Sequence, residues 1–438
     1  MQEKIKSLQK CKHCRQTLHY SEVCNSFVGK TYVRLWNTLA CASGEHIPTQ
    51  VRIAALWLRS RLDAPLNNKY ISFYFVLRSV FTTFAPMFSS PHNKVIKRLL
   101  VMRFSAMGDA AMTVPVLHAL ATQHPDLRIT MLTRTRFVPM FEWLPANVQV
   151  KGIDFEKQDG IIGLTKIYNK LKEGNFDAVA DLHDVLRSKY IRTCFAMAGI
   201  KVAKVNKGRS EKKALIGNGQ THAALTPMTE RYAEVFRSLG FPIDLTQPLK
   251  IDLKKEDFAP IRKWVGKKMP EEKWVGVAPF AAHQQKIYPL DKMQQVVNTL
   301  AKEGCKVLLF GAGKKEGDIL QTWENTQPST VLNVCGKMGG LKNEMLLMSQ
   351  LDLMISMDSA NMHIASIFGI TTLSIWGATH PKAGFSGYGQ KADNELQIDL
   401  PCRPCSIYGK KPCKFGDMRC MNIAPDTIAS RALKLLHK

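Results

Sequence analysis

A carboxylate near the start of a helix is the first residue whose position suggests chemistry. Asp109 lies in the segment RFSAMGDAAMTVP, where a short apolar run at 97–103 ends and a segment with helical spacing begins. Gly108 allows a tight turn at that junction, and the first amides of a helix attract an anionic group. Two interpretations of Asp109 stay open: it caps the helix, or it takes a proton from an attacking hydroxyl group.

Three further polar segments follow predicted strands later in the chain. Lys286, in PFAAHQQKIYP, precedes a helix, where its point charge suits a diphosphate; the alternative is a solvated surface lysine. In MDSANMHIAS, Ser359 is expected to cap a helix whose first amides face a ligand, with Asp358 before it. His363 lies one turn into that helix. It is interpreted either as a ligand contact or as a core histidine whose ring nitrogens have hydrogen-bond partners within the protein. The glycine turn Gly311–Gly313 indicates a close approach of the backbone.

The cysteines gather near the two ends of the chain. Four of the eleven form a C-x2-C-x7-C-x6-C pattern: Cys402, Cys405, Cys413 and Cys420. Four thiols at such spacing can hold zinc tetrahedrally, and the alternative is a set of free or buried thiols. A second CxxC, at Cys11 and Cys14, has no matching pair. The odd total and a charged start without a signal-peptide pattern predict a reducing, cytoplasmic environment.

Composition narrows the class of protein. The chain has 438 residues, which allows roughly two or three domains, and its 45% hydrophobic residues exclude a wholly disordered chain. There are 61 Lys and Arg against 36 Asp and Glu, a formal charge of +25. This excess favours anionic partners such as nucleic acid, lipid headgroups or phosphorylated substrates. The charge is dispersed, which argues against a disordered nucleic-acid-binding arm.

One long apolar segment needs separate treatment. Residues 70–88 contain Arg78 at their centre and Pro86 near their end. A central arginine costs a spanning helix about 2.5–3.5 kcal/mol. We therefore expect this segment to be buried or to lie at an interface, and not to cross a membrane.

Alternating strand and helix patterns begin at Lys97 and occur in two series. The first has predicted strands at 97–103, 128–133, 148–153 and 176–182 and predicted helices at 110–123, 137–144, 160–172 and 184–198. A basic stretch at 204–222 is predicted to be a mobile loop, followed by a helix at 229–239 and a connector at 241–258. The second has predicted strands at 274–280, 306–313, 331–336, 352–358 and 371–377, and predicted helices at 289–304 and 360–369. The strand at 371–377 is the last clear one.

This alternation predicts an α/β protein with two doubly wound, parallel-sheet domains. We expect a basic, cysteine-containing extension at 1–94, a first domain at 95–255, and a second domain at 256–438 that ends in a cysteine-rich loop and a terminal helix. Ligands of such sheets bind at the carboxyl ends of the strands, and with two domains in the cleft between them.

The order of the motifs resembles glycosyltransferase family 9, the ADP-heptose:lipopolysaccharide heptosyltransferases. The matching segments are RFSAMGDAAMTVPVLHAL, DLHDVLRS at 181–188, PFAAHQQKIYPLDKM, the GAG turn, DSANMHIA and TTLSIWGATHP. The resemblance extends over about 95–425, and it implies a GT-B fold, with two Rossmann-like domains facing across a cleft. The first domain would bind the acceptor and the second the nucleotide sugar.

The resemblance also implies roles for individual residues. Asp109 matches the family's general base, and Lys286 matches its donor-phosphate lysine. The donor motif falls on Asp358, Ser359, Ala360 and His363, with alanine where the family usually has glycine; Gly311 is added as a donor contact. On the acceptor side we expect Ser105, Met107, Gly108 and Arg187. No metal is implied for catalysis, so zinc at the four C-terminal cysteines would be structural.

The sequence therefore predicts an inverting, metal-independent glycosyltransferase that moves a heptose or related sugar from an ADP-sugar to a lipopolysaccharide core acceptor. Its expected partners are the nucleotide sugar, a lipid-anchored core oligosaccharide and an anionic membrane surface, at the cytoplasmic face of the inner membrane, with no nucleic acid and no required cofactor. One alternative is another GT-B enzyme with a different donor. The other is a zinc-containing nucleic-acid-binding protein, suggested by the charge and the CxxC pattern.

Overall fold

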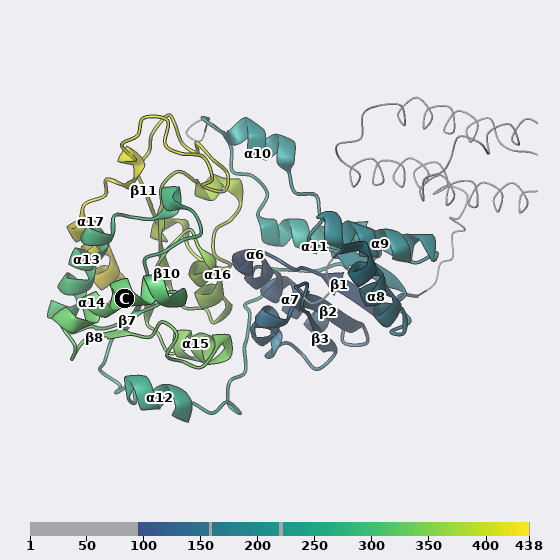
Figure 1. The fold of residues 1–438 in the computed structure, drawn as a ribbon, viewed down its shortest axis with the longest axis horizontal. Helices are drawn as coiled ribbons and strands as arrows, with labels where there is room; N and C mark the ends of the chain where they lie inside the picture. The colour runs from purple at the N-terminus through teal and green to yellow at the C-terminus, as the bar shows by residue number, and fades with distance from the viewer. Residues whose placement is uncertain (1–94, 157–159, 219–221, 438) are drawn as a thin grey trace, which may run out of the picture. The chain divides into compact units, whose positions relative to one another are not determined.

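The computed structural model describes residues 95–156, 160–218 and 222–437, and its strands form two parallel sheets (Figure 1). The first sheet has five strands in the order β3-β2-β1-β4-β5. Their bounds are β1 Arg98–Met102, β2 Arg128–Arg134, β3 Val148–Ile153, β4 Ala178–Asp181 and β5 Lys201–Lys204. Continuous apolar runs form the central strands because helices cover both faces, so β4 is buried at every residue.

The second sheet has six strands in the order β11-β10-β9-β6-β7-β8. Their bounds are β6 Trp274–Ala278, β7 Lys306–Leu309, β8 Val331–Asn333, β9 Leu353–Met357, β10 Thr372–Trp376 and β11 Glu395–Gln397. The three central strands β6, β9 and β10 are buried at every residue. The two doubly wound parallel sheets confirm the predicted fold class.

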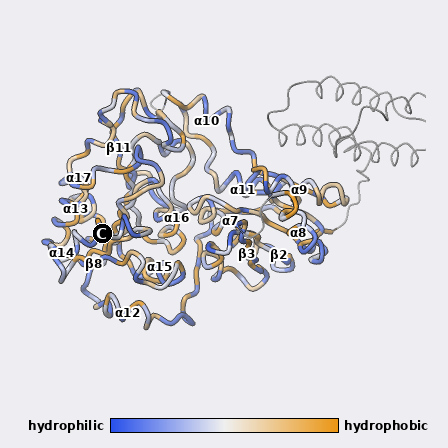
Figure 2. The backbone as a smooth tube through the Cα atoms, viewed as in Figure 1, coloured by the Kyte–Doolittle hydropathy of each residue, from blue (hydrophilic) through white to orange (hydrophobic). Residues whose placement is uncertain are grey.

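Helices connect the strands of each sheet. Those from the first sheet to the connector are α6 Met107–Ala111, α7 Thr113–Gln123, α8 Gly160–Lys172, α9 Leu186–Met197, α10 Arg209–Leu215 and α11 Met228–Leu239. Those that follow are α12 Ala259–Val265, α13 Leu290–Lys302, α14 Gly313–Thr326, α15 Leu341–Met348, α16 Ala360–Ile367 and α17 Pro425–Leu436. Figure 2 shows hydrophobic and hydrophilic residues alternating along most of them, as expected of helices with one buried face.

The prediction of a mobile loop at 204–222 is wrong over α10. Leu215 is fully buried, and Lys212 is 4% exposed. The Lys212 ammonium lies 3.2 Å from the sulfur of Met228 and 4.3 Å from the ring centroid of Phe385. The helix is thus stabilised by residues distant in sequence, which a local pattern does not reveal.

Other local predictions need smaller corrections. The helix expected at 110–123 is split at Met112 into α6 and α7. The helix expected at 137–144 is a 3-10 helix, η2 (Thr135–Phe141), which contains Pro139 and so lacks one backbone donor. The strand at 371–377 is not the last, because the short strand β11 pairs in parallel with β10.

Some predictions lie outside the described residues, namely those on the extension 1–94, including the segment 70–88 and the first CxxC. Within the part of the chain that the structure describes, no helix has both the length and the apolar character needed to cross a bilayer.

Candidate active site

The candidate residues follow strands on either side of the point where the strand order reverses in each sheet. In the first sheet this point lies between β1 and β4; Asp109 follows β1, and His183 follows β4. In the second it lies between β6 and β9; Lys286 follows β6, and Asp358 follows β9. Ligands of open α/β sheets bind at the carboxyl ends of strands at such points. Both sheets therefore present charged or polar side chains where ligands are expected.

Asp109, in the first turn of α6, is held by Arg103 and by its own helix start. Arg103 Nη2 lies 2.6 Å from Asp109 Oδ2, and the two side chains are 5% and 27% exposed. The same oxygen accepts the backbone N–H of Ala106 at 3.2 Å. Ala106 is the N-cap residue, so Asp109 is not itself the cap. Its carboxylate is oriented by two donors and remains partly open.

A buried polar turn lies beside this carboxylate, at the end of β4. Asp181 is fully buried; it accepts the backbone N–H of His183 at 2.9 Å and Arg192 Nη1 at 2.7 Å. His183 Nε2 is 3.2 Å from the hydroxyl oxygen of Ser105. Burial, with the positive charge of Arg103, lowers the pKa of His183 to about 3. The imidazole is therefore neutral at pH 7 and helps to fix the loop that contains Ser105.

Lys286 and Asp358 form an ion pair at the reversal point of the second sheet. Lys286 Nζ is 2.8 Å from Asp358 Oδ2, and the side chains are 15% and 8% exposed. A β-carbon on Gly409 would lie 2.6 Å from Lys286 Cγ, so the lysine stem is covered by this glycine. The interpretation of Lys286 as a solvated surface residue is wrong.

The two halves of the site meet where α6 contacts α16. A β-carbon on Gly108 would lie 2.9 Å from His363 Cδ2 and 3.4 Å from Ala360 Cα. Gly108 does not have a positive φ, so glycine is not required here for the expected tight turn. It is required because α6 and α16 approach each other closely at this position. Burial lowers the pKa of His363 to about 4, against the opposing charges of Asp358 and Asp109. His363 is thus a buried, neutral histidine between the two carboxylates.

The start of α16 differs from the predicted cap. Ser359 occupies the N-cap position, but its hydroxyl makes no capping hydrogen bond and lies instead 3.1 Å from the hydroxyl of Ser356. The first amides of α16 consequently have no side-chain cap. Such amides are the usual binding elements for phosphate groups.

The remaining candidates are more dispersed. Met107 begins α6 and packs against a hydrophobic core cluster to which both sheets contribute. Gly311 follows β7 and lies against Leu320 of α14. Arg187 is an exposed residue in the first turn of α9, with its guanidinium 4.9 Å from the ring centroid of Phe155.

Two lysines near Asp109, Lys207 and Lys212, were not identified from the sequence. Lys207 donates to the backbone oxygen of Asp184 at 3.4 Å. Burial, with the charge of Arg231, lowers the pKa of Lys212 to about 8, while Asp109 opposes the shift. The basic character of residues 204–222 was the available signal in the sequence. It did not show that these lysines lie near Asp109, because their position depends on the helix α10, which was not predicted.

Comparisons with known proteins agree with this arrangement. The description "Glycosyltransferase family 9 (heptosyltransferase)" matches residues 164–416, which is more than half of the chain. The chain belongs to glycosyltransferase family 9. The matched range includes Lys286, Asp358 and His363 but begins after Asp109, so the comparison does not bear on the proposed base.

Two curated relatives each cover more than 60% of this chain. Lipopolysaccharide heptosyltransferase 3 of Escherichia coli is 26% identical over 286 residues, which span 62% of this chain and 80% of that protein. Lipopolysaccharide core heptosyltransferase OpsX of Haemophilus influenzae is 22% identical over 292 residues, 65% of this chain and 80% of that protein. Membership of this family favours the glycosyltransferase interpretation over the nucleic-acid-binding alternative.

Solved structures share the fold. A family 9 glycosyl transferase from Veillonella parvula has a TM-score of 0.62 at 19% identity, over 78% of this chain and 98% of that chain. E. coli ADP-heptose lipopolysaccharide heptosyltransferase II has a TM-score of 0.58 at 17% identity, with the same coverage. The GT-B architecture expected for the family is confirmed.

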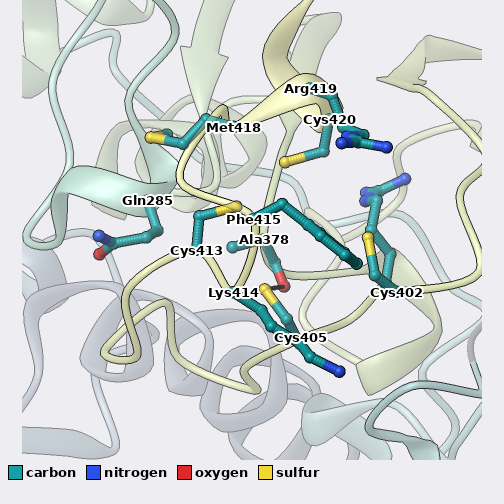
Figure 3. A pocket seen from close by; sticks show the side chains of 11 residues that line it. Gln285, Ala378, Cys402, Cys405, Cys413, Lys414, Phe415, Met418, Arg419 and Cys420 are labelled. Carbon is teal, nitrogen blue, oxygen red and sulfur yellow. Dashed lines mark hydrogen bonds between the residues drawn. The ribbon is translucent and has the colours of Figure 1, made fainter.

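The C-terminal cysteines of this family 9 chain gather around one small cavity (Figure 3). The lining residues include the four thiols, Gln285 and Ala378. Arg403, 1% exposed, anchors the loop by donating to the backbone oxygens of Gly377 and Thr379. In the described residues, no three His, Cys, Asp or Glu side chains are grouped so as to hold a metal ion. The thiols are free, and structural zinc stays a prediction.

The same loop reaches the candidate site. Gly409 covers Lys286, as described above. The charges of Asp109 and Arg103 act on the Tyr408 hydroxyl, whose pKa is raised mainly by burial, and the Tyr408 ring lies 5.8 Å from that of Phe385. The cysteine-rich loop is therefore part of the wall around both halves of the site.

Proposed function

We propose that this protein transfers a heptose from ADP-heptose to a lipopolysaccharide core acceptor, with inversion at the anomeric carbon and without a catalytic metal. The observation that carries the proposal is the contact of α6 with α16 at Gly108 and His363, which brings Asp109 toward the Lys286–Asp358 pair. The curated relatives are lipopolysaccharide heptosyltransferases by name, and one solved structural relative is an E. coli heptosyltransferase with ADP.

On the acceptor side, Asp109 acts as general base. Direct displacement requires a deprotonated hydroxyl, and a partly exposed carboxylate with a fixed orientation suits that role. Arg103 keeps the carboxylate oriented. Neutral His183 and Ser105 hold the adjoining loop. Ser105, Met107, Gly108 and Arg187 remain the proposed acceptor contacts.

On the donor side, Lys286 and the uncapped amides of α16 stabilise the departing diphosphate. Asp358 holds the ammonium in place before the donor binds. These groups supply positive charge without requiring a metal. Ser359, Ala360, His363 and Gly311 complete the proposed donor contacts, since they follow β9 and β7 at the same edge of the sheet.

The acceptor is proposed to be anionic and lipid-anchored. Lys207 and Lys212 add positive charge beside Asp109, and the chain as a whole is strongly basic. A phosphorylated core oligosaccharide at the cytoplasmic face of the inner membrane fits this charge. In this proposal residues 95–255 bind the acceptor, 256–438 bind the nucleotide sugar, and 1–94 form an extension.

A panel of nucleotide sugars tests the proposal. The protein is incubated with each donor and with phosphorylated or dephosphorylated core oligosaccharide, and the released nucleoside diphosphate is measured. We expect ADP release from ADP-heptose, faster with the phosphorylated acceptor, and a product of inverted anomeric configuration by NMR. Faster turnover of another nucleotide sugar would instead favour a GT-B enzyme with a different donor.

A further inference from the structure

Three apolar side chains are exposed at the starts of two neighbouring helices. Ile161 and Ile162, in the first turn of α8, are 42% and 74% exposed, and Leu186, in the first turn of α9, is 69% exposed. Exposed side chains of this size are unusual in a cluster, because leaving each in water forgoes the free energy of burial.

Two of these side chains, Ile161 and Leu186, lie one helical turn before a direct contact between the two helices. The Thr165 hydroxyl of α8 is 2.7 Å from the Tyr190 hydroxyl of α9, and the two helices pack together (Figure 1). Ile161 precedes Thr165 by four residues, and Leu186 precedes Tyr190 by four. On a helix that spacing returns to the same face one turn earlier. The first turns of α8 and α9 therefore form one apolar tip.

The tip lies at the same edge of the first sheet as the candidate site. The helices α8 and α9 follow β3 and β4, so both begin at the carboxyl ends of parallel strands, as α6 does with Asp109. Arg187, a proposed acceptor contact, is adjacent to Leu186 in the sequence. The apolar tip is consequently on the acceptor side.

The charged residues on the two helices themselves are all basic: Lys166, Lys170, Lys172, Arg187, Lys189 and Arg192. Acidic residues lie in the loops before them, Glu156 before α8 and Asp184 before α9, and Asp184 pairs with Lys189 and Arg192. Lys166 and Lys170 are exposed and follow Ile162 at intervals of four, on one stripe of α8. Apolar side chains at the tip with lysines behind them suit a bilayer, whose hydrocarbon accepts the former and whose anionic headgroups attract the latter.

We propose that the starts of α8 and α9 are the membrane-docking surface of this protein, with Ile161, Ile162 and Leu186 inserted among anionic lipids. The inference rests on the proposed function, because a lipid-anchored acceptor would then enter the site from the surface on which the enzyme lies. The inference goes beyond the proposed function because it assigns the membrane contact to one patch of the protein surface.

Vesicle co-sedimentation of the full chain tests the assignment. We expect binding to phosphatidylcholine vesicles that contain phosphatidylglycerol, with the partition coefficient lowered about tenfold by Ile162→Glu or Leu186→Glu. Lys166→Ala and Lys170→Ala should each lower it about fivefold. Met269→Glu is the matched control, since Met269 is 55% exposed in the segment between α12 and β6 and receives the same charge. Thermal melting verifies that each variant is folded.

Activity separates this inference from the proposed function. With a delipidated, soluble core acceptor, Ile162→Glu should release ADP at the wild-type rate; with acceptor in vesicles it should be slower. Equal vesicle binding by wild type, Ile162→Glu and Leu186→Glu would overturn the docking surface, and so would a change of oligomeric state in these variants without loss of vesicle binding. Absence of turnover with every acceptor would overturn the proposed function, while the vesicle result would still decide the docking surface.

Discussion

At the scale of single residues, the ion pair of Asp109 and Arg103 is the most informative contact. Arg103 also donates to the backbone oxygen of Leu182 at 2.6 Å. It therefore ties the loop after β1 to the end of β4 and fixes the carboxylate between them. A residue that only stabilised the start of α6 would not need a buried guanidinium as its partner.

Asp109→Asn tests this carboxylate. Asparagine keeps the size and the acceptor for Ala106 but cannot take a proton, so kcat should fall by a factor of about 10² to 10⁴ with unchanged affinity for ADP. The melting temperature should also fall, because Arg103 loses its anionic partner in a buried position. Initial rates, calorimetry with ADP and a melting curve measure the three quantities.

The matched control is Asp352→Asn. Asp352 is also 27% exposed, pairs with Lys268 at 2.8 Å and accepts the backbone N–H of Trp274. It lies at the opposite end of β9 from Asp358. This variant should lose stability and keep its kcat. A wild-type kcat in Asp109→Asn would rule out the general-base role.

Lys286→Ala should weaken ADP binding and turnover together. Loss of one hydrogen bond between charged groups costs about 1.5–3 kcal/mol, which corresponds to roughly a 10- to 100-fold rise in Kd. Lys286→Arg keeps the charge and should recover part of the affinity, whereas Lys292→Ala, a nearby lysine paired with Asn422, should change neither quantity. Calorimetry that gave an unaltered ADP affinity for Lys286→Ala would remove the lysine from the donor site.

At the scale of elements, the loop from Cys402 to Cys420 links a cavity of thiols to the candidate site. Its thiols have different environments. Burial raises the pKa of Cys420 to about 11. At Cys413 slight burial is outweighed by the backbone N–H groups of Met418 and Phe415, which lower the pKa. The rate at which each thiol is alkylated can therefore test the structure of this loop.

In reduced protein treated with chelator, iodoacetamide should modify Cys413 first and Cys420 last, because the thiolate is the reactive form. Mass spectrometry at increasing times measures the order. Equal rates at both sites would contradict the loop structure described here. If the thiols bind zinc, all four should be protected together before chelation and elemental analysis should find the metal; fast reaction of Cys413 in untreated protein would argue against it.

At the scale of the whole molecule, buried neutral histidines connect folding to pH. Burial lowers the pKa of His183 to about 3 and those of His363 and His380 to about 4. His380 Nδ1 accepts the backbone N–H of Lys382 at 3.1 Å, which requires a neutral ring. In the unfolded chain each histidine would take up a proton near pH 6.5.

The unfolded state therefore binds more protons than the folded state below about pH 6.5, and the free energy of unfolding should decrease as the pH falls from there toward 5. Each histidine contributes a slope of up to about 1.4 kcal/mol per pH unit. Denaturant unfolding at a series of pH values measures the slope, and His380→Gln should reduce it by one histidine's share. A flat profile in wild type over this range would show that the rings are not buried as described.

The sequence by itself determined most of the central strands and the location of the candidate site residues along the chain. Apolar runs of four to seven residues predicted most central strands, because both faces of a parallel sheet are covered and leave a continuous signal. Asp109, Lys286 and Asp358 each directly follow such a run or stand in the loop after it. Their place at strand ends is thus a local property, readable without the fold.

Only the tertiary structure decided which of these residues lie together. The ion pair of Lys286 and Asp358 joins residues far apart in the chain because β6 and β9 are neighbours in the second sheet. The burial of Lys212 depends on Met228 and Phe385, and the position of Gly409 against Lys286 depends on the whole C-terminal loop. Strand order and loop packing result from the combined burial of many side chains, so no local pattern contains them.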